Sequence, residues 1–137
     1  MTQVVGASKA CKRHGDAAAF ANLEKYYALV AHAVSAIDGR VIKVMGDGML
    51  LAFPTSRARD AINVLRRAQQ DANALWRGFD EGCRVQVKVT AGEVLVGRLG
   101  APGEERFDVY GDTLNMLFKP PWDDFLIAPP AEALLSG

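Results

Sequence analysis

The chain has 137 residues, and its 16 Lys and Arg balance its 16 Asp and Glu, which leaves a formal net charge of zero. This length predicts a single domain with its own core, and the apolar content of 50% excludes a disordered chain. The charge balance argues against a general nucleic-acid binder, and no apolar run reaches the roughly 18–20 residues of a membrane span. Cys11 and Cys83 fit no metal-binding spacing, so we expect two reduced thiols in a cytoplasmic protein rather than a disulfide.

Two long helices are predicted by apolar residues that recur every three or four positions. The first runs from Asp16, a suitable N-cap, to Ile37, and Gly39 would end it. The second opens near Pro54 and continues to Leu75. Each helix has one apolar face and therefore needs a sheet or another helix to cover it.

Hairpins and short strands separate and follow these helices. Residues 40–44 and 49–53 are apolar runs on either side of a Gly-Asp-Gly turn, which is a strong hairpin signal. Residues 84–89 alternate polar and apolar side chains, with Lys88 on the polar side, as in a half-buried strand. Residues 93–99 are expected to pair with that strand through the bend at residues 91–92. The shorter elements expected are strands at residues 2–5, 107–110 and 125–128, and helices at residues 112–119 and 130–135.

The order of these elements favours an α+β fold. A strand, a helix, a hairpin, a second helix and a further strand form the split βαβ pattern of a ferredoxin-like core. Such a core has an antiparallel-rich sheet with helices packed on one face. The fold class by itself decides no function, because ferredoxin-like cores host many unrelated activities.

Three segments contain the residues that point to chemistry. They are DGRVIKVMGDGMLLAF at residues 38–53, VKVTAGEVLVG at residues 87–97 and RFDVYGDTLN at residues 106–115. In this order and at this spacing they resemble the catalytic domain of class III nucleotidyl cyclases, the adenylate and guanylate cyclases. The likeness runs from about Val4 to Leu135. It implies one cyclase catalytic domain over residues 1–137 that lacks the start of the first strand and the final strands.

Asp47 is the candidate metal ligand. It lies between two glycines, so it is either a simple turn residue or a ligand for a hard cation that also holds phosphates. The resemblance implies the second interpretation, with Asp47 as one of two aspartates that hold two Mg²⁺ or Mn²⁺ ions. The other aspartate belongs at the end of the first strand, where Gln3 stands in this chain.

Lys43 and Asp108 are the candidate base-binding residues. Taken alone, a lysine and an aspartate are ordinary solvated surface residues. The resemblance implies that together they recognise adenine, whose N1 accepts a hydrogen bond and whose 6-amino group donates one. An ammonium and a carboxylate match that polarity, whereas guanine presents the reverse.

Asn115 and Lys119 are the candidate catalytic residues. The resemblance implies that Asn115 orients the ribose. One helical turn later, at the position of Lys119, the family has an arginine that stabilises the phosphoryl transition state. Lysine keeps the charge but loses the planar fork of arginine, and Lys119 could equally be a C-terminal cation favoured by the helix dipole.

These residues lead to two hypotheses about function. In the first, the chain is an adenylate cyclase domain that converts ATP to 3′,5′-cyclic AMP and pyrophosphate, with Mg²⁺ or Mn²⁺, at the interface of a head-to-tail homodimer. In the second, a cyclase-homology domain has lost turnover and acts as a nucleotide-binding or dimerising regulatory module. The four intact site residues favour the first hypothesis, whereas Gln3 and Lys119 favour the second.

Overall fold

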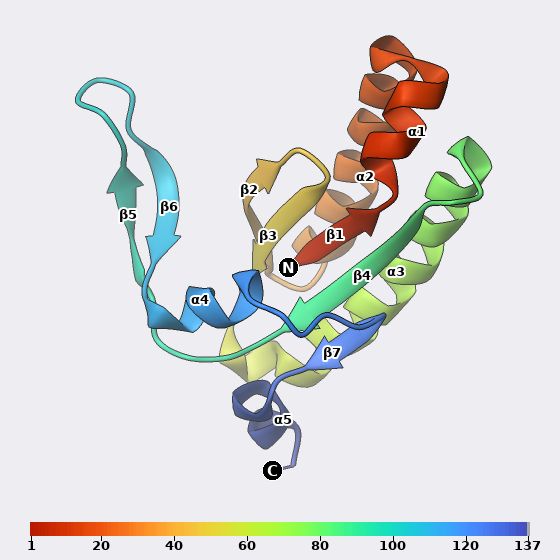
Figure 1. Cartoon of the computed structure of the whole chain (residues 1–137). Coiled ribbons are helices and arrows are strands. Elements are labelled where there is room, and N and C mark those ends of the chain that lie inside the picture. Colours follow the sequence, from red (N-terminus) through yellow and green to blue (C-terminus); the bar gives the residue numbers. More distant parts are fainter. Residues whose placement is uncertain (137) are drawn as a thin grey trace.

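The computed structural model describes residues 1–136 and arranges them as one main sheet, one separate ribbon and the helices around them (Figure 1). The strands are β1 (Thr2–Val5), β2 (Arg40–Met45), β3 (Gly48–Ala52), β4 (Arg84–Val89), β5 (Leu95–Leu99), β6 (Arg106–Tyr110) and β7 (Phe125–Ile127). The helices are α1 (Ala7–His14), α2 (Asp16–Ser35), α3 (Ala58–Phe79), α4 (Asp112–Phe118) and α5 (Pro129–Leu135), and a short 3₁₀ turn spans Thr55–Arg57.

The main sheet has the strand order β2-β3-β1-β4-β7, and its first four strands form the core that the sequence predicts. Strand β1 lies between β3 and β4 and runs antiparallel to both, while β2 and β3 form the antiparallel hairpin. Helix α2 connects β1 to β2, and α3 connects β3 to β4, which is the split βαβ order. Strand β7 adds to β4 in parallel. The expected α+β fold with a ferredoxin-like core is confirmed.

Both faces of the sheet are covered, and two neighbouring residues of β3 show how. Met49 belongs to the main core, which also buries Trp76 of α3. Leu50 points the opposite way, because side chains alternate along a strand, and it packs with Val109 of β6 and Leu117 of α4. The sequence predicts helices on one face only. The second, smaller cluster places β6 and α4 against the other face.

The partner of β5 differs from the prediction. We expected residues 93–99 to form a hairpin with β4, but β5 pairs antiparallel with β6, with Gly97 opposite Asp108. Strands β1 and β7 already occupy the two edges of β4, so β5 has no free edge there. In Figure 1 the β5–β6 ribbon extends away from the body of the molecule.

Helix α1 is an element that the sequence analysis did not predict. Most of its residues are polar or charged, and Ala10 is its one buried residue. Gly6 turns the chain from β1 into α1 with a φ of 88°, and a Cβ at this position would lie 2.5 Å from the carbonyl oxygen of Gly82. Glycine meets both conditions, because it adopts positive φ readily and has no Cβ.

Several element boundaries differ from the predicted ones by a few residues; for example, α2 ends at Ser35 and α3 spans Ala58–Phe79. Asp16 is the first residue of α2 rather than its cap, and Gly15 holds the N-cap position. The hairpin loop consists of Gly46 and Asp47, while Gly48 already belongs to β3. The φ of 62° at Gly46 provides the positive dihedral angle that such a two-residue loop needs.

Two expectations from composition concern the cysteines and the membrane. Cys11 and Cys83 are both free, as the sequence predicts. None of the helices within residues 1–136 combines the length and the apolar character needed to cross a bilayer.

Candidate functional site

An irregularity in β2 directs Lys43 towards the β5–β6 ribbon. The pairing register of β2 and β3 shifts between Val41 and Lys43, so Ile42 is an extra residue in β2. Lys43 then lies opposite Leu50, and residues directly opposite each other project from the same face of a sheet. Since Leu50 packs against β6 and α4, Lys43 lies on that face as well.

Lys43 and Asp108 form an ion pair. The Lys43 Nζ donates to Asp108 Oδ2 at 3.2 Å, and the two side chains are 38% and 26% exposed. The backbone N–H of Val109, which donates to the Asp108 carboxylate, and the Lys43 ammonium together hold the pKa of Asp108 below its ordinary value. Asp108 is therefore ionised at neutral pH, and both side chains remain accessible to a ligand.

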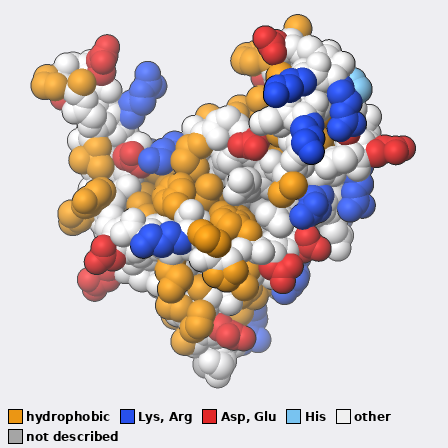
Figure 2. All heavy atoms as spheres, viewed as in Figure 1, with side chains coloured by type: hydrophobic (Ala, Val, Ile, Leu, Met, Phe, Trp, Pro, Cys, Tyr) orange, Lys and Arg blue, Asp and Glu red, His pale blue; other side chains and the backbone are white. Residues whose placement is uncertain are grey.

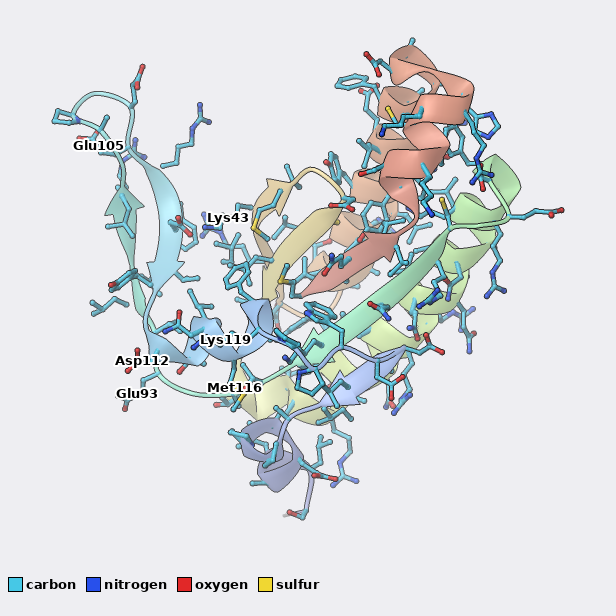
Figure 3. The ribbon with its side chains drawn as sticks, viewed as in Figure 1. Lys43, Glu93, Glu105, Asp112, Met116 and Lys119 are labelled. Carbon is cyan, nitrogen blue, oxygen red and sulfur yellow. The ribbon has the colours of Figure 1, made fainter. Side chains whose placement is uncertain are left out.

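A second contact joins the same two strands. The guanidinium of Arg40 lies 3.7 Å from the centre of the Phe107 ring, which is a favourable cation–π distance. Figure 3 shows Lys43 extending from β2 towards the ribbon. Strands β2 and β6 are thus held together at two points around the candidate base-binding residues.

Asn115 and Lys119 lie on and just after α4. The Asn115 amide donates to Asp112 Oδ1 at 3.3 Å, and the side chains of Asn115 and Lys119 are exposed. We expected the helix to run through Lys119, but it ends at Phe118 and Lys119 has an extended backbone. Pro120 explains the difference, because proline disfavours helical backbone at the residue before it. Figure 3 shows Lys119 at this end of α4.

Asp47 and Gln3 share an open cleft of about 570 Å³ beside the hairpin turn. Gln3 pairs in register with the residue that follows Asp47. The Val4 N–H donates to the Asp47 carbonyl oxygen at 3.0 Å, which ties the turn to β1. Lys9 and Arg13 of α1 also line the cleft, so it contains one carboxylate and two cationic groups.

The donor groups in this cleft fit one divalent ion better than two. Asp47 is half-buried, and burial raises the pKa of its carboxyl above the ordinary value. Across residues 1–136, no cluster of three or more His, Cys, Asp and Glu residues could hold a metal by itself. A hard cation can be held by one carboxylate together with substrate phosphates. The Asp47 carboxylate and the Gln3 amide oxygen therefore fit a single ion that arrives with a nucleotide, and not a pair of ions held by two aspartates.

The predicted site residues form three groups in one chain. Lys43 meets Asp108, Asp47 meets Gln3, and Asn115 and Lys119 lie along α4 and its end. Within the described part of the chain, no hydrogen bond or ion pair joins Asp47 to any residue of the other two groups. The fold thus brings the two candidate base-binding residues into contact, but within one copy it leaves them without a hydrogen bond or ion pair to Asp47.

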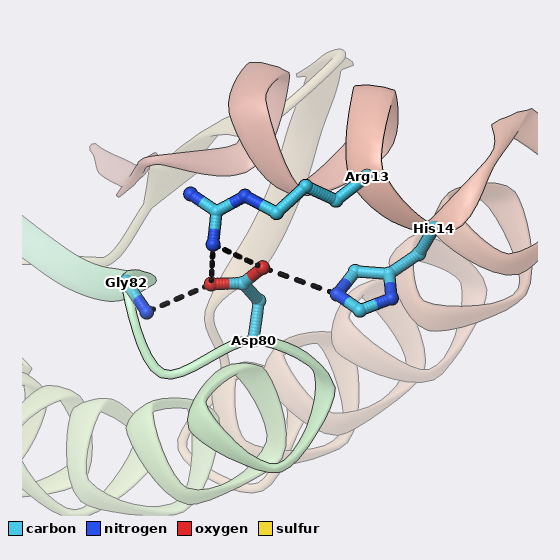
Figure 4. Close-up of polar contacts among 4 residues, drawn as sticks. All are labelled: Arg13, His14, Asp80 and Gly82. Atoms are coloured by element: carbon cyan, nitrogen blue, oxygen red, sulfur yellow. Dashed lines mark hydrogen bonds and ion pairs between the residues drawn. The ribbon is translucent and has the colours of Figure 1, made fainter.

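A cluster around Asp80 anchors α1, which lines the cleft (Figure 4). The Asp80 Oδ2 atom lies 3.2 Å from Arg13 Nη1 and 3.1 Å from His14 Nε2, and the Gly82 N–H donates to Oδ1 at 2.8 Å. The carboxylate is 5% exposed, and the Gly82 hydrogen bond is the main cause that lowers the pKa of Asp80. This cluster was not predicted from the sequence. An Asp-Glu-Gly turn after α3 could have suggested Asp80, but nothing local identifies its partners on α1.

Among curated proteins, the chain is similar to adenylate cyclase 2 of Rhizobium meliloti (strain 1021), with 23% identity over 119 residues. The match covers 82% of this chain and 32% of that protein, so the chain spans about a third of the length of this relative. No protein-family model matches the chain.

Solved structures with the same fold include three cyclases. The adenylyl cyclase CyaB from P. aeruginosa has a TM-score of 0.81 at 14% identity, with 98% of this chain and 77% of that chain covered. The guanylyl cyclase Cya2 has a TM-score of 0.79 at 17% identity, with coverages of 97% and 74%. The catalytic core of a rhodopsin-guanylyl cyclase with converted specificity, in complex with ATPαS, has a TM-score of 0.81 at 17% identity, with coverages of 99% and 78%.

The motifs, the strand order and these structures agree on the same fold. The superpositions extend over nearly the whole chain, which includes the β5–β6 ribbon and α4 as well as the ferredoxin-like core. The resemblance is confirmed: the chain has the fold of the class III adenylyl and guanylyl cyclase catalytic domains.

Proposed function

We propose that this chain is an adenylate cyclase catalytic domain, which converts ATP to 3′,5′-cyclic AMP and pyrophosphate at sites shared between two copies. The observation that supports this most is the ion pair between Lys43 and Asp108 at 3.2 Å. The two residues lie far apart in the sequence, and the motifs assign base recognition to both. Their contact on the accessible face of β2 and β6 is what an adenine-binding pair requires.

The Lys43–Asp108 pair matches the edge of adenine. The Lys43 ammonium would donate to N1, and the Asp108 carboxylate would accept a hydrogen bond from the 6-amino group. The lowered pKa of Asp108 keeps the carboxylate an acceptor at neutral pH. Guanine presents the reverse polarity, so it would leave polar groups of the protein without partners.

The cleft at Asp47 suits the phosphates of ATP. Ionised Asp47 would hold one Mg²⁺ or Mn²⁺ that arrives with the nucleotide, and the ion would supply positive charge beside the phosphates when bound. Lys9 and Arg13 line the same cleft and add two further cationic groups. Ammonium and guanidinium groups form charge-assisted hydrogen bonds to phosphate oxygens.

The reaction is an attack of the ribose 3′-oxygen on the α-phosphate, with pyrophosphate as the leaving group. Asn115 would orient the ribose through its side-chain amide. The exposed Lys119 ammonium would stabilise the charge that develops on the phosphoryl oxygens. Because lysine lacks the bidentate fork of arginine, we expect weaker stabilisation than an arginine would give.

A head-to-tail homodimer would bring the cleft of one copy to the base-binding pair of the other. Figure 2 shows hydrophobic side chains gathered between the ribbon and the body of the molecule. Exposed apolar patches of this kind mark surfaces for protein association. The exposed large apolar residues of the ribbon, of α4 and of the position just before β5 are Val94, Leu95, Val96, Leu99, Tyr110, Met116 and Phe118.

A second candidate function is a regulatory module that binds nucleotide or dimerises without turnover. Gln3 favours this candidate, because it lies beside Asp47 and contributes an amide where a two-ion centre needs a carboxylate. Lys119 favours it as well, since it replaces the arginine that the resemblance leads us to expect.

Cyclic AMP formation by the purified chain, with ATP and Mn²⁺, tests the proposal. We expect cyclic AMP from ATP, little cyclic GMP from GTP, and no product from Asp47→Asn, which serves as the matched inactive control. If neither the unaltered chain nor Gln3→Asp turns over but both bind ATP, the regulatory module is the correct function.

A further inference from the structure

Lys88 is buried in the main sheet, which is unusual for a lysine. The residue is 2% exposed, although the alternation along β4 places it on the polar side of the strand. On that same side, Arg84 is exposed and Gln86 is only half-buried, so full burial is particular to Lys88. Lysine is almost never fully buried without partners, because removing its charge from water is unfavourable.

Backbone carbonyls, and not a carboxylate, bind the Lys88 ammonium. The Nζ atom donates to the carbonyl oxygen of Lys119 at 2.5 Å and to that of Pro121 at 3.0 Å. It also lies 5.6 Å from the centre of the Trp122 ring, within the range of a cation–π contact. In residues 1–136 the ammonium has no ion-pair partner. Its polar contacts are therefore all with residues 119–122.

Residues 119–122 have few hydrogen bonds of their own to hold them. Lys119 leaves the helix with an extended backbone, and the two prolines that follow have no N–H to donate. Lys88, in contrast, comes from a strand that is paired on both edges, with β1 and β7. Its side chain thus ties the chain after α4 to a rigid part of the fold.

We propose that Lys88 is a positioning residue for Lys119. By holding the Lys119 carbonyl, it fixes the backbone from which the Lys119 side chain reaches the phosphates. The role of Lys119 in catalysis rests on the proposed function, whereas the anchoring of residues 119–122 does not. Misplacing a catalytic group by about 1 Å can lower a rate roughly a hundredfold, so an anchor of this kind affects turnover.

Kinetics of Lys88→Met, which removes the ammonium and keeps an unbranched chain, test the proposal. We expect kcat for cyclic AMP formation to fall about tenfold to a hundredfold, with KM for ATP within about twofold. Gln86→Met, on the same side of the same strand, should leave both constants unchanged. In a Lys119→Ala background, Lys88→Met should lower kcat no further. The proposal would be overturned if Lys88→Met changed only KM. It would also be overturned if Lys88→Met lowered kcat by the same factor in the Lys119→Ala background as in the unaltered chain.

A second measurement needs no turnover and so separates this proposal from the cyclase function. The chain has two tryptophans, and fluorine-labelled tryptophan gives one NMR signal for each. Lys88→Met should shift or broaden the Trp122 signal and leave that of Trp76, buried in the main core, unchanged. Should Lys88→Met not fold, Lys88→Gln, which keeps hydrogen-bond donors on a shorter side chain, provides both readouts.

The outcomes of the two measurements are distinct. A Trp122 signal that moves in a protein without turnover supports the anchor and counts against the cyclase function alone. If the Trp122 signal stays unchanged in the folded variant, the anchor is refuted, whatever the activity.

Discussion

The candidate base-binding pair, Lys43 and Asp108, and the cleft beside Asp47 both include residues of the β2–β3 hairpin, yet their charges are arranged differently. At the pair, Lys43 and Asp108 already neutralise each other at 3.2 Å. In the cleft, Asp47 is half-buried and, within the described residues, has no cation in ion-pair contact. In the pair, each charged group has an ion-pair partner before a ligand binds, whereas in the cleft the Asp47 carboxylate has none among the described residues.

The pKa shifts of the two carboxyls follow this difference. The Val109 N–H and the Lys43 ammonium lower the pKa of Asp108, whereas burial raises the pKa of Asp47. A raised pKa means that the folded state disfavours the ionised carboxyl. A bound cation would instead stabilise the ionised form of the Asp47 carboxyl. For this reason we assign the metal ion to the cleft and the base to the Lys43–Asp108 pair.

The largest expected effect comes from placing a defect in the cleft and a defect on α4 on different copies. Asp47→Asn and Asn115→Ala should each be inactive as pure homodimers. Mixed and allowed to exchange, they should form heterodimers in which one site has both defects and the other has none. Random pairing makes about half of the dimers mixed, each with one sound site of two, so about a quarter of the parental activity should return. A monomer by light scattering at high concentration, or proven exchange without recovery, would disprove the shared site.

The next largest effect concerns the pair alone. Lys43→Ala and Asp108→Ala should each reduce the preference for ATP over GTP, measured as the ratio of kcat/KM values. An unpaired polar group in the site is worth about 1–3 kcal/mol, which corresponds to roughly tenfold to a hundredfold in the ratio. Arg106→Ala, at an exposed position two residues from Asp108 on β6, is the control and should keep the preference. If the ratio of kcat/KM values for ATP and GTP is unchanged in both Lys43→Ala and Asp108→Ala, the pair does not recognise adenine.

A smaller effect is expected from adding charge to the cleft. Gln3→Asp should raise the cyclase rate and tighten Mg²⁺ binding by about tenfold, because it provides a second acidic ligand. Gln3→Asn has the same size as the aspartate without its charge and should change neither quantity. Equal rates and equal Mg²⁺ affinities for Gln3→Asp and the unaltered chain would show that Gln3 is not at the metal position.

The smallest effect is on the stability of the fold. The pH dependence of that stability has opposite signs for the carboxyls of Asp47 and Asp80. Because the pKa of Asp47 is raised in the folded state, ionising this carboxyl costs stability. Stability therefore decreases as pH rises from the ordinary Asp value of 3.8 to the raised pKa. Asp47→Asn should therefore melt at a higher temperature than the unaltered chain at neutral pH, and this gain should vanish in acid. In thermal unfolding followed by circular dichroism, an Asp47→Asn variant that melts lower at neutral pH would contradict the account.

Asp80 provides the matched contrast. Its pKa is lowered, so its stabilisation is present above the ordinary value of 3.8 and is lost as pH falls through the lowered pKa. Asp80→Asn should melt at a lower temperature at neutral pH, and the difference from the unaltered chain should shrink in acid. A constant difference at all pH values would mean that the ionised carboxylate is not what stabilises the α1 anchor.

The core of the fold could be predicted because its signals are local. The recurrence of apolar residues in α2 and α3, the alternation in β4 and the Gly-Asp-Gly turn each act over a few residues. Helix α1 escaped prediction because it buries little apolar surface, and Gly6 is needed for its contact with Gly82, far along the chain. The pairing of β5 was wrong because β7, which occupies the edge of β4, comes later in the sequence.

The sequence suggested the candidate site residues but not how they are arranged. The motifs identified Lys43 and Asp108, while their contact depends on the register shift in β2 and on the placement of β6. Lys88 illustrates the limit most clearly. Its position in the alternating strand predicts the polar side, and its burial comes from residues 119–122, which no pattern within β4 reveals.

Calorimetric titration of the unaltered chain with ATP and with GTP tests most directly whether the Lys43–Asp108 pair is an adenine-binding site. Our account predicts that ATP binds roughly tenfold to a hundredfold more tightly, because guanine leaves the ammonium or the carboxylate unpaired. Equal affinities for the two nucleotides would contradict it.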